Sequence, residues 1–197
     1  MQRYNKKCTY ARKRALFSKK DRFIYLYTIY LHISKKYSTF AEPSTNTTIN
    51  MQIGDKMPTF SVADQQGNIV TNEQMLGKKT VIYFYPKDST PGCTAEACNL
   101  RDNYQRFLAE GYQVYGVSKD SQKSHQNFIA KYELPFPLLS DPSTEMLQAF
   151  GAWGEKKMCG KTCVGTLRKT FVFDEQGILT QLIEKVDTKN HAAQLLR

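Results

Sequence analysis

Two cysteines stand five positions apart in the segment TPGCTAEAC, at Cys93 and Cys98. A Thr-Pro-Gly sequence precedes the first of them, and these residues form turns rather than hydrophobic core. We therefore expect a strand over residues 81–85, a loop, and a helix that begins at Cys93. The unpaired N–H groups and positive dipole end of a helix N-terminus favour the thiolate, which is the reactive form of cysteine. This position predicts that Cys93 is a nucleophile.

The spacing of these two cysteines restricts how they can react with each other. Five residues along an α-helix place two Cα atoms roughly 8.7 Å apart, whereas a disulfide needs Cα atoms within about 7 Å. Cys93 and Cys98 can therefore join only if the first turns of the helix unwind. This suits a site where Cys93 is oxidised first, to a sulfenic acid, and a nearby thiol then condenses with it.

The elements that position this segment alternate between strands and helices. Strands are predicted within residues 59–64, 68–71, 78–86, 112–118, 135–141 and, as a pair around a turn, 169–186. Helices are predicted at residues 94–108, 121–132, 143–151 and 188–197. The alternation predicts an α/β fold, with a central mixed sheet that is flanked by helices and antiparallel at its hairpins.

The charge of the chain is concentrated at one end. Residues 1–50 hold 11 of the 28 Lys and Arg residues but 2 of the 18 acidic ones, so residues 51–197 are close to neutral. This distribution argues against nucleic-acid binding by residues 51–197. The five cysteines are odd in number and do not resemble the dense disulfide framework of a small secreted protein, which indicates a reducing compartment and hence a cytoplasmic location. No apolar run approaches the roughly 20 residues of a membrane-spanning helix, so no membrane association is expected.

Residues 1–50 are predicted to be a basic leader, either disordered or preceding the true start, and residues 51–197 to be the folded domain. Three interpretations of the leader are open. It is a secretory signal that ends in the small-residue sequence STFA, an organelle transit peptide, or an upstream translation before a start at Met51. In none of them does the leader carry chemistry, and Cys8 is expected to be an idle thiol.

Two separated segments resemble a known family. PKDSTPGC fits the PxxxTxxC signature of peroxiredoxins through Pro86, Thr90 and Cys93. Its continuation, TPGCTAEACNLRD, resembles the peroxiredoxin Q or bacterioferritin comigratory protein branch, whose second cysteine lies five residues on. The later segment WGEKKMCGKTCVGTLRKTFVFDEQG is similar to the same branch. The resemblance covers about residues 51–197, and the combination of motifs makes it specific.

The resemblance implies a thioredoxin-like fold and a thiol peroxidase that needs no metal or other cofactor. Cys93 would be the peroxidatic cysteine, whose thiolate attacks hydrogen peroxide or an organic hydroperoxide and becomes a sulfenic acid. Thr90 would hydrogen-bond the thiolate and the peroxide, Arg168 would hold the thiolate and polarise the peroxide, and Pro86 would shield the site from water. Cys98 would be the resolving cysteine, and thioredoxin or a similar dithiol protein would reduce the intramolecular disulfide.

Three further residues could bear on this site. Arg101 is an alternative to Arg168 for holding the thiolate. His125 and His191 lie in no recognisable motif and are expected to be exposed or packing residues. Both reactive cysteines belong to one chain, which permits a monomer.

Cys159 and Cys163 depart from the resemblance, because the branch is expected to carry other residues, often aromatic ones, in this segment. They are either substitutions without consequence or an auxiliary redox pair. The identity of the thiol that resolves Cys93 is therefore undecided between Cys98 and this pair. A second function class is a metal-binding module, with Cys93, Cys98, Cys159 and Cys163 as thiolate ligands. A third is a thioredoxin-like dithiol reductase, although the chain lacks a CxxC motif.

Overall fold

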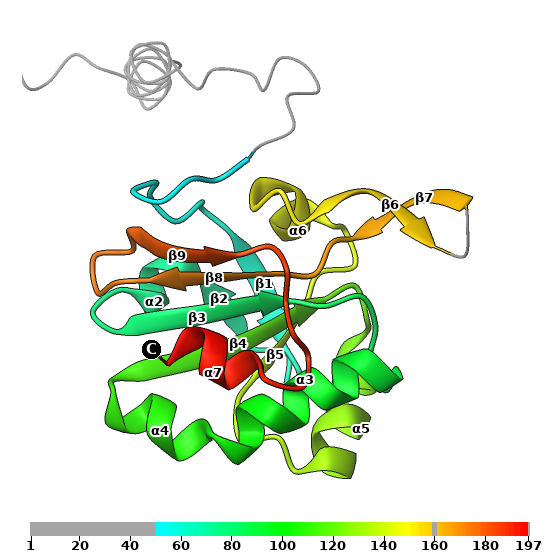
Figure 1. The fold of residues 1–197 in the computed structure, drawn as a ribbon, viewed down its shortest axis with the longest axis horizontal. Coiled ribbons are helices and arrows are strands. Elements are labelled where there is room, and N and C mark those ends of the chain that lie inside the picture. Colours follow the sequence, from blue (N-terminus) through cyan, green and yellow to red (C-terminus); the bar gives the residue numbers. More distant parts are fainter. Residues whose placement is uncertain (1–49, 159–160, 197) are drawn as a thin grey trace, which may run out of the picture. The chain divides into compact units, whose positions relative to one another are not determined.

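A seven-stranded mixed sheet forms the centre of the fold in the computed structural model, which describes residues 50–158 and 161–196 (Figure 1). The strand order is β2-β1-β5-β4-β3-β8-β9. Strands β3, β4 and β5 are parallel, and the other pairings are antiparallel. The bounds are β1 Ser61–Asp64, β2 Ile69–Thr71, β3 Lys79–Phe84, β4 Tyr112–Ser118, β5 Leu138–Ser140, β8 Lys169–Phe173 and β9 Leu179–Ile183. The predicted leader and Cys8 lie outside the described residues.

Helices flank this sheet. Their bounds are α2 Asn72–Met75, α3 Pro91–Asp102, α4 Tyr104–Ala109, α5 Gln122–Tyr132, α6 Glu145–Ala149 and α7 His191–Leu195. Helices α3, α4, α5 and α7 contribute to one hydrophobic core, and α6 contributes to a second core on the other face. The predicted α/β class, with a central mixed sheet flanked by helices, is confirmed. Within the described part of the chain, every helix is too short or too polar to span a membrane.

Strand β3 is the central element that leads to the candidate site. Its side chains alternate between the two cores: Val81 and Tyr83 face the core under α3, α4, α5 and α7, while Ile82 and Phe84 face the other. All four are buried, because both faces of the sheet are covered. The β-branched and aromatic run therefore fits a strand that is buried on both sides.

A glycine allows the central strands to pack around an aromatic ring. A Cβ atom at Gly116 of β4 would lie 2.7 Å from the hydroxyl of Tyr83 and 2.6 Å from Cδ2 of Leu138. Both distances are too short for non-bonded atoms in a close-packed interior. Gly116 therefore leaves the space that the Tyr83 ring occupies.

The predicted helix over residues 94–108 is wrong in its bounds. The helix begins earlier, at Pro91, whose fixed φ suits the first helical turn. It also stops at Asp102, because Asn103 has φ −105° and ψ 7°. Asn103 turns the chain and starts the separate helix α4, and its side-chain Nδ2 donates a hydrogen bond to Asn99 O at 2.9 Å.

A second, two-stranded sheet was not predicted. Strands β6 (Trp153–Met158) and β7 (Lys161–Thr166) pair in an antiparallel hairpin that extends away from the main sheet (Figure 1). Gly154 and Gly165 face each other in this pairing, and glycine weakens the sequence signal for a strand. The hairpin leads the chain from α6 to the start of β8.

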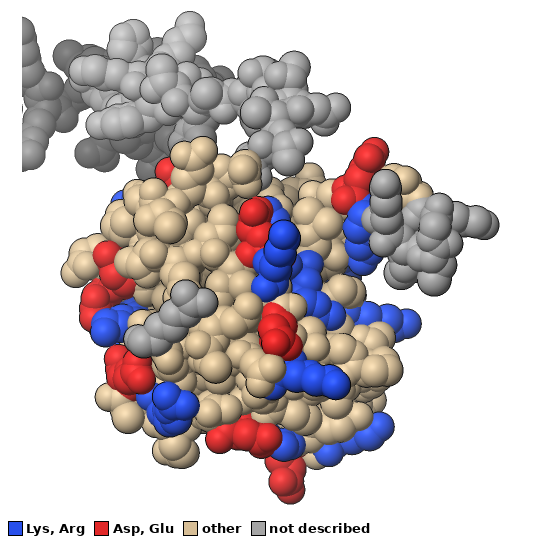
Figure 2. All heavy atoms as spheres, viewed as in Figure 1, with Lys and Arg blue, Asp and Glu red and all other residues tan. Residues whose placement is uncertain are grey.

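The surface of the described residues carries both charge signs. Figure 2 shows Lys and Arg side chains interspersed with Asp and Glu side chains on the face that it presents. This mixture matches the near-neutral charge of residues 51–197.

Candidate active site

Cys93 lies in the first turn of α3 and is 2% exposed. The preceding loop leaves β3 and reaches the helix through Ser89, which adopts a left-handed backbone conformation with φ 57°. Thr90 is the N-cap residue, in an extended conformation, and its carbonyl oxygen accepts a hydrogen bond from Thr94 N–H at 2.8 Å. The prediction that a helix begins next to Cys93 is confirmed, so helix N–H groups and the helix dipole act on its sulfur.

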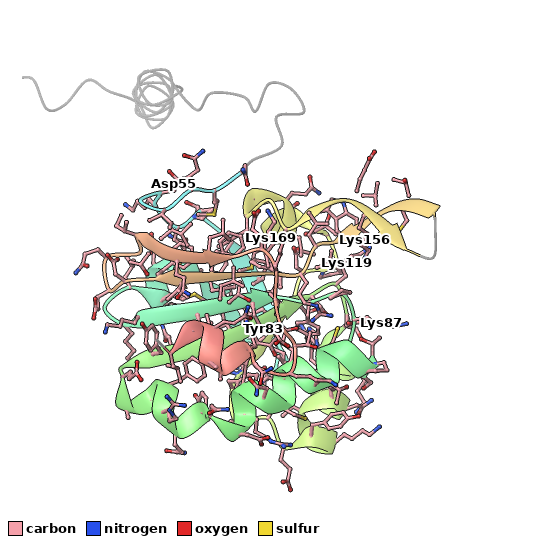
Figure 3. The ribbon with its side chains drawn as sticks, viewed as in Figure 1. Asp55, Tyr83, Lys87, Lys119, Lys156 and Lys169 are labelled. Atoms are coloured by element: carbon pink, nitrogen blue, oxygen red, sulfur yellow. The ribbon has the colours of Figure 1, made fainter. Side chains whose placement is uncertain are left out.

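Arg168 contacts this sulfur. Its Nη2 lies 3.2 Å from Cys93 Sγ, although the two residues are 75 positions apart. The register of the sheet explains the contact: Lys169 pairs with Phe84, so Arg168 is delivered to the end of β3. In Figure 3, Lys169 and Lys87 mark the two segments that bound the site, the start of β8 and the loop after β3. A guanidinium stays charged at every working pH and stabilises a thiolate.

Glu96 and Cys93 both act on the pKa of Arg168. Burial alone would lower the pKa of Arg168, but the charges of Glu96 and Cys93 outweigh it and raise this pKa. Arg101 is placed differently: its Nη1 donates to Tyr132 O at 2.7 Å. Of the two arginines considered from the sequence, Arg168 is therefore the one that contacts the thiol.

Glu96 is a site residue that sequence reasoning missed. It follows Cys93 by three positions on α3, which places both on one side of the helix. Its carboxylate is fully buried and forms an ion pair with Nη1 of Arg168. Burial raises the pKa of Glu96 to about 7, and the charge of Arg168 only partly opposes this. Arg168 is thus held between a thiol and a carboxyl group that titrates near neutral pH.

His191, in α7, joins the buried polar cluster that Arg168 and Glu96 form. Its Nε2 lies 2.9 Å from Thr170 Oγ1 and 3.8 Å from Glu96 Oε1. Its Nδ1 lies 3.1 Å from Gln194 Oε1, which only accepts hydrogen bonds, so Nδ1 carries the proton and Nε2 accepts from Thr170. Burial lowers the pKa of His191 to about 4, so the ring is neutral at pH 7. Of the two alternatives expected for His191, exposed or packing, the structure shows a buried packing residue.

The Thr90 hydroxyl is turned toward the loop. It donates a hydrogen bond to Lys87 O at 3.1 Å, and the hydrogen bonds of the described residues include none between Thr90 and Cys93 Sγ. A hydroxyl has one proton, so Thr90 must rotate before it can donate to the sulfur or to a peroxide. Pro86 is half-buried at the start of the same loop.

A buried network of hydrogen bonds around Asp88 anchors this loop. Asp88 accepts hydrogen bonds from Tyr85 OH at 2.7 Å and from Ser124 Oγ at 2.6 Å, and its Oδ2 lies 2.9 Å from His125 Nδ1. The other ring nitrogen of His125 lies 3.2 Å from Leu139 O, which only accepts. Both ring nitrogens of the buried His125 therefore face groups that accept hydrogen bonds. Burial would raise the pKa of Asp88, but these hydrogen bonds lower it.

The three described cysteines are free thiols. Cys93 is buried, Cys98 is half-buried, and α3 is continuous between them, which is the arrangement predicted to require unwinding. Cys163 lies on β7, 3.6 Å from Lys156 O. Cys159 lies outside the described residues, so the four-thiolate hypothesis stays a prediction. In residues 50–158 and 161–196, no group of three or more His, Cys, Asp or Glu side chains is placed to hold a metal ion.

Comparisons with known proteins agree with this geometry. Residues 53–182 match the AhpC/TSA family. Peroxiredoxin Bcp of Bacillus subtilis is 41% identical over 149 residues, which cover 76% of this chain and 95% of the relative. Peroxiredoxin Bcp of Escherichia coli is 40% identical over 141 residues, which cover 72% of this chain and 90% of the relative.

Solved structures give the same result. The bacterioferritin comigratory protein of Xanthomonas campestris, studied for its alkyl peroxide reduction activity, superposes with a TM-score of 0.66 at 39% identity, covering 70% of this chain and 87% of that one. A cysteine mutant of Xylella fastidiosa PrxQ gives a TM-score of 0.70 at 31% identity, covering 75% and 94%. The chain therefore belongs to the AhpC/TSA family, as a thioredoxin-like peroxiredoxin of the Bcp or peroxiredoxin Q type, and is a thiol peroxidase.

Proposed function

We propose that Cys93 is the peroxidatic cysteine of this peroxidase and Cys98 its resolving cysteine. The observation that carries the proposal is the 3.2 Å contact between Arg168 Nη2 and Cys93 Sγ at the first turn of α3. A cation and a helix N-terminus at one sulfur both favour the thiolate, and the thiolate is the nucleophile in this chemistry.

In the first step, the Cys93 thiolate attacks one oxygen of a hydroperoxide. The O–O bond breaks, the sulfur is oxidised to a sulfenic acid, and the leaving alkoxide or hydroxide takes up a proton to become an alcohol or water. Arg168 stabilises the negative charge, which moves from the sulfur to the leaving oxygen. Thr90 donates to the peroxide after it rotates away from Lys87 O, and Pro86 shields the sulfur from bulk water.

In the second step, the Cys98 thiol condenses with the sulfenic acid. A disulfide forms between Cys93 and Cys98, and the sulfenic hydroxyl leaves as water with the thiol proton. Because α3 is intact, its first turns unwind before this bond can form. A dithiol protein such as thioredoxin then reduces the disulfide by exchange and is itself oxidised.

The substrates that this scheme supports are hydrogen peroxide and organic hydroperoxides. Oxidation of Cys93 and formation of the disulfide both occur within one chain and need no cofactor, which is compatible with a monomer. The odd number of cysteines, without the dense framework of a small secreted protein, supports a reducing compartment such as the cytoplasm.

The test follows each step in reduced protein that is mixed with one equivalent of hydrogen peroxide. Stopped flow measures peroxide consumption and intact mass spectrometry identifies the product, for wild type, Cys93→Ser and Cys98→Ser. Cys163→Ser is the matched control, because it removes a half-buried thiol from β7 rather than from α3.

Rapid consumption should be lost in Cys93→Ser only. A sulfenic acid should accumulate in Cys98→Ser, and the wild type and the control should each lose the mass of two hydrogens. If Cys93→Ser consumes peroxide as fast as wild type, the peroxidatic assignment is wrong. If peptide mapping joins Cys93 to Cys159 or Cys163, the assignment of Cys98 is wrong.

A further inference from the structure

Asn99, the residue after Cys98, links α3 to the C-terminal helix α7. Its Nδ2 donates a hydrogen bond to Lys189 O at 2.8 Å, and its Oδ1 accepts one from Ala192 N–H at 2.8 Å. A single amide therefore holds both the approach to α7 and the first turn of that helix. Figure 1 shows α7 close to α3.

Helix α7 depends on this contact for a cap. The first N–H groups of a helix have no partner within the helix and are usually satisfied by the side chain of the N-cap residue. The N-cap residue of α7 is Asn190, and its side chain makes no such hydrogen bond. Asn99 Oδ1 performs this task from another helix, through Ala192 N–H.

Asn99 also lies next to the cysteine that must approach Cys93. Cys98 reaches Cys93 only when the helix between them unwinds. Asn99 follows Cys98 directly, so a movement of Cys98 toward Cys93 would pull Asn99 away from Lys189 and Ala192. Both hydrogen bonds to α7 then break together.

We propose that Asn99 is a positioning residue for the resolving step, because its two hydrogen bonds to α7 keep Cys98 in the folded helix. The proposal rests on the proposed role of Cys98. In this scheme Asn99 slows the condensation of the Cys98 thiol with the Cys93 sulfenic acid, which releases water. It has no part in the earlier attack on the peroxide.

Slower condensation has a chemical consequence. A sulfenic acid that waits longer for Cys98 is exposed longer to a second peroxide molecule, which oxidises it to a sulfinic acid and is itself reduced to an alcohol or water. Asn99 therefore sets the division of Cys93 between the recyclable disulfide and the overoxidised form.

The test compares Asn99→Ala with Asn127→Ala, which removes an exposed asparagine from α5. Loss of two hydrogen bonds should speed disulfide formation about tenfold, with an unchanged rate for the first reaction with peroxide. The sulfinic fraction of Cys93 at excess peroxide should fall. Asn99→Asp keeps the acceptor for Ala192 N–H but loses the donor to Lys189 O, so its rate should lie between the two. Asn127→Ala should behave as wild type.

Equal rates of disulfide formation in wild type and Asn99→Ala, or a slower rate in the variant, would overturn the proposal. If Asn99→Ala fails to fold, Asn99→Asp decides alone: a rate equal to or below that of wild type rejects the role. Hydrogen exchange gives an independent readout, since α3 amides should lose protection in both Asn99 variants. A failure of the proposed function appears elsewhere, as disulfide formation that persists in Cys98→Ser.

Discussion

Burial and Arg168 have opposite effects on the pKa of Glu96. The substitution Glu96→Gln can measure which effect is larger. Burial favours the neutral carboxyl, while Arg168 favours the carboxylate. The pKa of about 7 means that burial dominates. Glutamine keeps the size and the hydrogen-bonding oxygen of the neutral form and removes the titration.

The expected magnitude follows from the two pKa values of Glu96. The folded value, about 7, lies above the ordinary value of 4.5, so the folded protein binds this proton more tightly than the unfolded chain. The resulting stabilisation is fully present below pH 4.5 and is lost as the pH rises toward 7. This pKa difference corresponds to about 3 kcal/mol. The free energy of unfolding of Glu96→Gln, relative to wild type, should therefore rise by about 3 kcal/mol over this range.

His191 contributes with the opposite sign. Its folded pKa, about 4, lies below its ordinary value of 6.5, so its contribution is present above pH 6.5 and is lost as the pH falls toward 4. In wild type the two slopes offset each other where the ranges overlap. Because His191 is present in both proteins, its contribution largely cancels in the difference between their free energies of unfolding. In the Glu96→Gln variant taken by itself, the free energy of unfolding should rise with pH because of His191.

The assay is urea unfolding of wild type and Glu96→Gln in a reducing buffer, at several pH values between 4.5 and about 8. Glu184→Gln serves as the control, because Glu184 meets Lys169 at 3.0 Å but is largely exposed, and its loss should cost less than about 1 kcal/mol. A difference between Glu96→Gln and wild type that stays flat, or falls as the pH rises, would refute the reasoning. It would show that Glu96 is ionised throughout, and that the ion pair with Arg168 outweighs burial.

Three further substitutions test other parts of the structure. Gly116→Ala places a Cβ 2.7 Å from the Tyr83 ring, so urea unfolding should show a loss of about 1–3 kcal/mol; unchanged stability would mean that the ring shifts freely. Asp88→Asn removes the carboxylate that faces the buried His125 ring. The same measurement should show a loss of about 3–5 kcal/mol, whereas a loss under about 1 kcal/mol would mean that the imidazole is neutral. Thr90→Val removes the side-chain hydroxyl, so stopped flow should show peroxide consumption slowed about 100-fold. Thr90→Ser keeps a hydroxyl and should retain the rate. Equal rates in both variants would exclude the hydroxyl from catalysis.

The parts of the site that sequence could predict are those set by neighbouring residues. The Thr-Pro-Gly turn and the aromatic strand before it place Cys93 at a helix N-terminus through local geometry alone. The alternation of strands and helices likewise predicts the sheet, because each signal spans a few residues. The helix bounds were wrong because Asn103, which is tolerated inside helices, ends α3 through its own backbone conformation.

The parts that depend on distant contacts could not be predicted in the same way. Arg168 has a lysine beside it and looks like a surface cation, and only the family resemblance pointed to it. Glu96 and His191 meet because α7 packs on α3, and no local pattern encodes that contact. The spacing of Glu96 from Cys93 on one helix was the available signal. Strands β6 and β7 were missed because lysines and glycines dilute their strand propensity.

The antiparallel pairing of β8 with β3 fixes when Cys93 acquires Arg168 as a neighbour during synthesis of the chain. A ribosome adds Cys93 75 residues before Arg168, and the guanidinium reaches the sulfur only once β8 has paired with β3. Until then the nascent chain carries the Cys93 thiol without the neighbouring cation. The contact between the guanidinium and the buried sulfur thus arrives together with the completed sheet, and an incomplete chain lacks it.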